Sequence, residues 1–251
     1  MNYHWYWGIL LQSEPGGTGS YLHYLVVGLG WTLATALAAW VIALLVGSVV
    51  GTLRTTPLKW VVRAGNLYVE IFRNVPLIVQ MFLWFFVLPE LVPQALGDFM
   101  KQVPPPWGSY FPAVACLGIY TSVRVAEQVR AGIQSLPRGQ RMAGTALGLT
   151  LPQTYRFVIL PMAFRIVLPP LTSEFMNIIK NSSVALTIGL LELTGRARAM
   201  QEFSFQVFEA FAAATVIYLL TNLVVVLGMR TLETRVRVPG FIGSAQGAGG
   251  H

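Results

Sequence analysis

Charged residues are scarce in this sequence. Asp, Glu, Lys and Arg make up 11% of its 251 residues, and hydrophobic residues make up 55%, whereas an ordinary soluble domain has about 25% charged residues. So few charges could not cover a soluble globule, and large apolar patches would face water. The composition therefore argues against a soluble enzyme or a disordered chain. It favours one integral membrane domain of four to six helical spans, at about 20 residues per span.

Catalytic and metal-binding motifs are also absent. The single cysteine, Cys116, excludes an internal disulfide framework and a CxxC metal site. No lysine follows a glycine, so the chain has no GxxxxGK[ST] loop to cradle nucleotide phosphates. HExxH and GxSxG do not occur, and His4, His23 and His251 are scattered along the chain. We therefore expect no catalytic residue, no metal site and no cofactor bound by this chain.

Long uncharged runs predict five transmembrane helices in an all-α fold. No Lys or Arg precedes Arg54, so the basic start of a signal peptide is missing. The expected spans are residues 25–53, 67–89, 103–136, 166–191 and 210–229. The second is expected as a helix that extends back from the uncharged run 74–89. The fourth is expected to be interrupted by Pro169, Pro170, Glu174 and Lys180.

Two glycines in the first span form a GxxxG pattern. Gly47 and Gly51 would let another helix approach closely. Glycine is also common in membrane helices, so the pattern leaves both interpretations open.

Basic residues predict the orientation of the spans. Arginines and lysines cluster after the first span, between the third and fourth, and after the fifth, and these segments are expected in the cytoplasm. The N-terminus and the segments 90–102 and 192–209 carry few bases and are expected outside. An outside N-terminus and an inside C-terminus require an odd number of spans, as five provides. The net charge of +7 is then an orientation signal and not a footprint for nucleic acid.

These signals predict three regions. Residues 1–24 form an aromatic N-terminal segment outside the membrane, with Tyr3, Trp5, Tyr6 and Trp7 suited to the membrane–water interface. Residues 25–230 form the transmembrane domain. Residues 231–251 form a flexible cytoplasmic tail, which is rich in glycine after residue 240.

The cytoplasmic segment 136–161 predicts a helix–turn–helix outside the membrane. Gly148 is well placed to end a short first helix, and Thr150 with Gln153 forms a capping box for the second. The first helix is lined with the small residues Ala143, Gly144 and Ala146, and a short helix gains most of its stability from packing. It therefore needs a partner surface, unless the segment is a hairpin that merely joins two spans.

Ionisable residues at membrane depth are candidates for function. Glu70 with Arg73, and Arg124 with Glu127, have i,i+3 spacing and could pair on one helix face. Lys180 has no acid three or four residues away, and polar residues follow it. It could attract a substrate carboxylate, or it could pair with Glu174 or a neighbouring helix. The candidate translocation pathway comprises Glu70, Arg73, Arg124, Glu127, Glu174, Lys180, Asn181 and Ser182.

The cytoplasmic segment resembles the EAA loop of ABC transporter permeases, whose pattern is EAA, three residues, Gly, nine residues, then I-x-L-P. Met142-Ala143-Gly144 occupies the EAA positions, Gly148 the glycine, and residues 158–161 the I-x-L-P. Met142 replaces the glutamate and Gly144 the second alanine. The loop at 138–161 is thereby expected to dock on an ATPase. The residues expected to couple it are Gly139, Gln140, Met142, Ala143, Gly144, Leu147, Gly148, Leu160 and Pro161.

Other segments resemble the polar amino acid permeases of the same family. Residues 68–77 (YVEIFRNVPL) are similar to their YVEFFRGTPL element, residues 126–133 (AEQVRAGI) to AEIxRGGI, and residues 179–183 (IKNSS) to LKDTS. The resemblance implies the type I ABC importer fold in the bacterial inner membrane. It also implies two permease subunits, two ATPase subunits that bind ATP and Mg²⁺, and a periplasmic binding protein that delivers the amino acid. Within the family, the aromatic N-terminus and the stretches 135–140 and 149–161 are similar to those of permeases for glutamate and aspartate, which implies one of these as the substrate.

Two other functions remain open from the residues. A stand-alone secondary transporter would be favoured by an inverted repeat, and none is visible. A non-transporting membrane scaffold or receptor would explain the hydrophobicity, but not the loop pattern or the charges at membrane depth. The residues do not decide between a homodimeric and a heterodimeric permease pair.

Overall fold

The structure is a computed structural model that describes residues 3–17 and 19–236. The regular elements in that part of the chain are all helices, which confirms the all-α prediction. Most of the glycine-rich tail predicted at 231–251 lies outside the described residues. Its first residues belong to the last helix, which runs to Val236.

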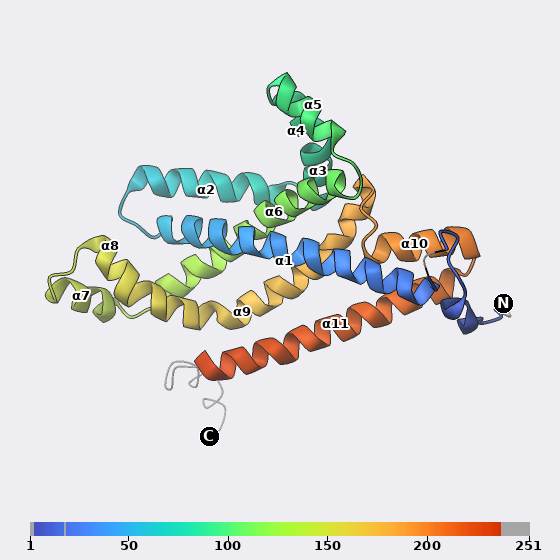
Figure 1. The fold of residues 1–251 in the computed structure, drawn as a ribbon. Coiled ribbons are helices and arrows are strands. Elements are labelled where there is room, and N and C mark those ends of the chain that lie inside the picture. Colours follow the sequence, from blue (N-terminus) through green and yellow to red (C-terminus); the bar gives the residue numbers. More distant parts are fainter. Residues whose placement is uncertain (1–2, 18, 237–251) are drawn as a thin grey trace.

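The helices form an elongated bundle with the N-terminus at one end and the helix–turn–helix segment at the other (Figure 1). In chain order the elements are η1 (Trp7–Leu11), α1 (Tyr21–Leu53), α2 (Lys59–Asn74), α3 (Leu77–Phe82), η2 (Leu83–Val87), α4 (Leu88–Leu91), α5 (Gln94–Gln102), α6 (Trp107–Gln134), α7 (Arg138–Ala146), α8 (Leu151–Thr154), η3 (Tyr155–Ile159), α9 (Leu160–Asn181), η4 (Ser182–Ile188), α10 (Leu193–Ser204) and α11 (Val207–Val236).

The centre of the bundle is the contact between α1 and α6. Gly47 and Gly51 face α6, and a β-carbon at either position would lie 2.6 Å from a backbone oxygen, that of Ser122 or of Ala126. Only glycine lets the two backbones lie this close. The close-packing interpretation of the GxxxG pattern is therefore confirmed.

The second predicted span is not one straight helix. α2 and the segment Leu77–Leu91 meet at an angle of 100°. Pro76 lacks an N–H and disfavours helical geometry at the preceding residue, and Val75 is extended at φ −97° and ψ 126°. The Gln80 side chain donates to the backbone oxygens of Phe72 (2.8 Å) and Val75 (2.9 Å). These two carbonyl groups at the bend therefore have a hydrogen-bond donor. After the bend, α3 packs against α6, and α4 and α5 project away from the bundle (Figure 1).

The fourth predicted span is longer than expected at its N-terminal end. One helical path runs from Leu151 to Ile188, through α8, η3, α9 and η4. Pro169 and Pro170 lie inside α9 and do not interrupt it, so the expected break at these prolines is wrong. The helical geometry changes instead at Tyr155–Ile159, which is a π-helix, and at Ser182, where the helix tightens into a 3-10 helix.

Three helices of the described chain are long and apolar enough to cross a membrane: Tyr21–Leu53, Leu151–Ile188 and Val207–Arg235. The bent pair α2 and α3–α4 adds a fourth if it counts as one span. Helix α6 is long enough, but it carries Arg124, Glu127 and Arg130. The five-span count and the outside position of the N-terminus stay predictions.

The end of the bundle that carries the N-terminus is stabilised by buried acids, which lie in the segment 192–209 that the sequence predicted as a loop on the outside. Glu192 is fully buried and caps α10 by accepting from the backbone of Thr194 (3.0 Å) and Gly195 (2.8 Å). It also accepts from Thr32 of α1 (3.2 Å) and from Tyr218 of α11 (2.9 Å). One carboxylate therefore joins three helices.

The aromatic N-terminal segment lies against α11. Tyr3 donates its hydroxyl to buried Glu209, and the backbone of Tyr6 donates to the same carboxylate at 2.7 Å. Trp5 and Trp7 stack with ring centroids 5.5 Å apart, and both are exposed. Helix α1 begins at Tyr21, a few residues before the predicted boundary at 24.

Candidate functional site

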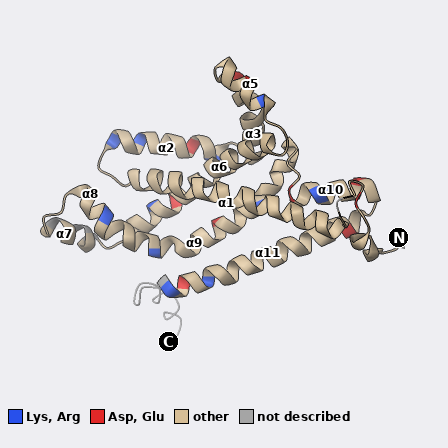
Figure 2. Ribbon diagram, viewed as in Figure 1, with Lys and Arg blue, Asp and Glu red and all other residues tan. Residues whose placement is uncertain are grey.

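A charged cavity of about 300 Å³ lies between α2, α6 and α9. Its walls combine four residues of the predicted pathway with aromatic, apolar and polar neighbours. The lining residues are Phe72, Arg73, Tyr120, Val123, Arg124, Glu127, Gln128 and Glu174. Figure 2 shows basic and acidic residues on these helices, whereas α1 has none along its length. The sequence does not show that these residues line one cavity, because they come from three helices that are far apart in the chain.

The ion pairs in this region differ from the predicted ones. Arg124 faces Glu174 of α9, with Nε 4.0 Å from Oε2. Glu127 binds Arg54 at 2.9 Å and Arg130 at 3.6 Å. The expected pair of Arg124 with Glu127 is therefore wrong, because Arg124 faces α9, and Glu127 binds Arg54 at the end of α1 and Arg130 on α6 itself.

The other expected pair, Glu70 with Arg73, is also wrong. Both side chains are exposed, and no ion pair joins them among the described residues. Arg73 lines the cavity and Glu70 does not. The i,i+3 spacing allowed the pair, but an exposed pair of this kind contributes only a few tenths of a kcal/mol, about 0.2–0.5.

Glu174 is the buried acid of the cavity. The residue is 7% exposed, and its Oε2 atom has no hydrogen-bond donor among the described residues. Arg124, by contrast, keeps half of its side chain exposed, with its guanidinium 5.8 Å from the ring centre of Tyr120. A buried carboxylate that lacks a donor costs free energy unless a ligand supplies one. A carboxylate beside a guanidinium suits a ligand that carries both an ammonium and a carboxylate group.

Lys180, Asn181 and Ser182 do not line this cavity. Lys180 is exposed at the end of α9, and it forms no ion pair with Glu174 in the described structure. Pairing of Lys180 with Glu174 is therefore wrong, because Arg124 occupies that position. Ser182 is buried and donates to the backbone oxygen of Ile179 at 2.8 Å, so the change to a 3-10 helix is stabilised locally.

The predicted helix–turn–helix is confirmed at 138–154. Gly148 follows α7 with φ +74°, the left-handed conformation that glycine adopts at a helix end. The backbone of Thr150 donates to Gln153 Oε1 at 2.8 Å, as in a capping box. The second helix does not stop at Leu160 and Pro161 but continues into α9.

The small residues of the loop lie on two surfaces, one packed against α8 and one exposed. Gly144 is buried against α8, where a β-carbon would lie 2.7 Å from Thr154 Cγ2, so this residue packs inward and not against a partner. Met142 and Leu147 are 69% and 76% exposed. Gly139, Ala143 and Ala146 are exposed as well. The exposed set forms a small apolar surface with no covering element in the described chain.

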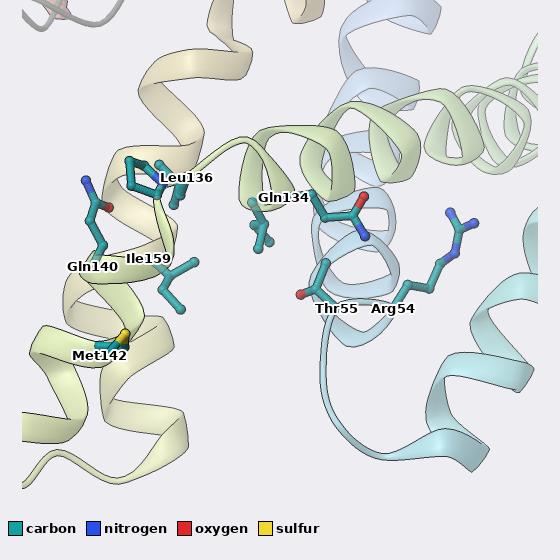
Figure 3. Close-up of a pocket in the computed structure, with 9 residues that line it drawn as sticks. Arg54, Thr55, Gln134, Leu136, Gln140, Met142 and Ile159 are labelled. Atoms are coloured by element: carbon teal, nitrogen blue, oxygen red, sulfur yellow. The ribbon is translucent and has the colours of Figure 1, made fainter.

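A second cavity, of about 510 Å³, separates α7 from the ends of α1 and α6. Gln140, Met142 and Ile159 lie on one side of it, and Arg54, Thr55 and Gln134 lie on the other (Figure 3). Sequence reasoning used Arg54 only as an orientation signal. It missed that the side chain is 5% exposed and paired. A signal was available, since Arg54 follows a long uncharged span directly.

Comparisons with known proteins agree with this architecture. Residues 43–238 match the family model described as "Binding-protein-dependent transport system inner membrane component". The chain is 48% identical to the glutamate/aspartate import permease protein GltJ of Escherichia coli K12 over 97% of this chain and 99% of that one. It is 33% identical to the probable glutamine ABC transporter permease protein GlnM of Bacillus subtilis, over 82% and 89%.

Two solved structures have the same fold. A crystal structure of an amino acid ABC transporter with histidines matches with a TM-score of 0.72 and 30% identity, over 86% of this chain and 95% of that one. An inward-facing structure of the MetNI methionine ABC transporter matches with a TM-score of 0.73 and 19% identity, over 90% and 100%. The chain therefore has the fold of the type I ABC importer permeases.

Proposed function

Because the chain belongs to the family of binding-protein-dependent transport system inner membrane components, and is a permease of an ABC amino acid importer, we propose that it imports glutamate and aspartate. The observation that carries the proposal is the 48% identity, over nearly the whole chain, to a glutamate/aspartate permease. As a multi-pass membrane subunit the chain is not itself an enzyme. ATP and Mg²⁺ are bound by partner subunits.

The charges of the cavity between α2, α6 and α9 support an acidic substrate. Glu127 is already engaged by two arginines outside the cavity. The remaining charged walls are Arg73, Arg124 and Glu174, which offer two positive charges and one negative charge. Glutamate and aspartate carry two carboxylates and one ammonium, the complementary set. Glutamine lacks the second carboxylate and would leave one guanidinium without a partner.

The assembly we propose has two permease subunits, which are this chain with itself or with a homologous chain. Two ATPase subunits dock on the surface of α7 around Met142 and Leu147, and a periplasmic binding protein delivers the amino acid. The location is the bacterial inner membrane, with the N-terminal segment 1–24 on the periplasmic side. Exposed apolar side chains on α7 support the docking, because a short exposed helix of this composition gains stability by being covered.

Uptake by the complex reconstituted in liposomes tests the proposal. We expect ATP-dependent uptake of glutamate and aspartate, and weak competition by glutamine. Arg124→Gln should lower glutamate uptake about 10-fold, the effect of one charged hydrogen bond. Arg198→Gln is the matched control, because the ion pair of Arg198 within the described residues is an exposed i,i+4 pair with Glu202, away from the cavity. Uptake without the ATPase would indicate a secondary transporter, and preference for glutamine would refute the proposed substrate.

A further inference from the structure

Arg54, at the C-terminal end of α1, joins this helix to α6 and α2. Arg54 Nη1 lies 2.9 Å from Glu127 Oε1 on α6, and its Nε donates to Asn66 Oδ1 on α2 at 2.8 Å. The side chain is 5% exposed, so the charge is held by these partners and not by water. Glu127 is also a wall of the charged cavity. Arg54, which does not line this cavity, therefore pairs with Glu127, which does.

Thr55, the next residue, joins the end of α1 to the loop segment by hydrogen bonds. The Tyr155 hydroxyl donates to the backbone oxygen of Thr55 at 2.8 Å and lies 3.1 Å from Thr55 Oγ1. Tyr155 is 6% exposed and begins η3. The preceding residue, Thr154, packs against Gly144 of α7, where no β-carbon fits. Contacts thus run without a gap from α7 to the end of α1.

The 510 Å³ cavity keeps part of α7 out of direct contact with α1. It separates Gln140 and Met142 from Arg54 and Thr55, so this part of α7 is not packed directly against α1 (Figure 3). Helix α7 contacts α8 and η3 instead. A displacement of α7 can therefore reach α1 through Thr154 and Tyr155, in addition to the short segment 135–137 that joins α7 to α6.

We propose that Arg54, Thr55 and Tyr155 form a joint that transmits movement between the loop helix α7 and the charged cavity. The inference rests on the proposed function, because it needs an ATPase that moves α7 and a substrate that occupies the cavity. When α7 shifts, the Tyr155 hydroxyl moves Thr55, and Arg54 then changes its hold on Glu127. By reciprocity, substrate in the cavity changes the position of α7. These three are positioning residues, and none of them needs to touch the substrate.

Tyr155→Phe in the reconstituted complex tests the joint. It removes one hydroxyl and keeps the ring, so packing is preserved. The readout is the ratio of ATP hydrolysis with delivered substrate to hydrolysis without it. We expect this ratio to fall about 2- to 10-fold, the effect of one neutral hydrogen bond. Tyr218→Phe is the matched control, because it removes a hydroxyl that joins helices at the opposite end of the bundle. Its ratio should stay at the wild-type value.

A double-variant cycle separates transmission from general weakening. Arg54→Gln should also lower the ratio, with Arg54→Lys restoring part of it. The double variant with Tyr155→Phe should lose no more than the worse single variant, because both act on one path. Multiplied losses would overturn the joint, as would a normal ratio in Tyr155→Phe or an equal fall in Tyr218→Phe. If the wild type shows no stimulation by substrate, the proposed function fails and the joint fails with it. Copurified ATPase, measured for each variant, shows that assembly is intact.

Discussion

Adding one methyl group at Gly47 should separate the two central helices. A β-carbon there would lie 2.6 Å from the backbone oxygen of Ser122 and 2.6 Å from Val125 Cβ, whereas ordinary contact begins at 3.4 Å. A backbone oxygen cannot rotate away as a side chain can. In Gly47→Ala, α1 and α6 must therefore move apart by about 0.8 Å and lose dispersion contacts along their interface.

The same helix offers a matched control. Gly30 lies on the exposed side of α1, and a β-carbon there would meet nothing within 4 Å. Both substitutions remove the entropic cost of a helical glycine, which is about 0.5–1 kcal/mol. Only Gly47→Ala adds the overpacking cost of about 1–3 kcal/mol. The free energy of unfolding of the two variants should therefore differ by about 1–3 kcal/mol, with Gly47→Ala the less stable.

Thermal unfolding of the detergent-solubilised chain measures this difference. For a chain of this size, about 2–4 °C of Tm corresponds to 1 kcal/mol. Gly30→Ala should keep or raise the wild-type Tm, and Gly47→Ala should lie about 2–12 °C below Gly30→Ala. An equal rise of Tm in both variants would show that α1 and α6 do not approach as closely as the structure places them.

Three further predictions concern the loop, the C-terminal end of α9 and the topology. Gly148→Val should insert normally but uncouple ATP hydrolysis from uptake, because its left-handed conformation costs about 1 kcal/mol or more with a β-carbon; Gly148→Asn should be milder, and normal substrate-stimulated hydrolysis and uptake in the valine variant would contradict a docking role. Lys180→Met should leave abundance and uptake near the wild-type values, because the side chain is exposed, does not line the cavity and forms no ion pair with Glu174 in the described structure; a fall in both that adding Glu174→Gln restores would contradict the pairing of Glu174 with Arg124. Reporter tags should place the N-terminus outside and the C-terminus in the cytoplasm, and finding both on one side would refute the five-span prediction.

Local signals in the sequence predicted the loop well. The left-handed Gly148 and the capping box of Thr150 with Gln153 depend on residues a few positions apart, so spacing alone determines them. The bend at Pro76 was equally local and was nevertheless missed. There the uncharged run 74–89 suggested a continuous span, although a proline disfavours helical geometry at the residue before it.

The sequence by itself determined that this chain is a helical membrane protein, and it determined the local shape of the loop at 138–154. Each of these follows from composition or from neighbours in the chain. The tertiary structure decided which charges meet. Arg124 pairs with Glu174, Arg54 with Glu127, and Glu192 joins three helices, although the partners lie many residues apart. An i,i+3 rule cannot find such pairs, because helix packing selects the partner and burial makes the long-range pair the stronger one.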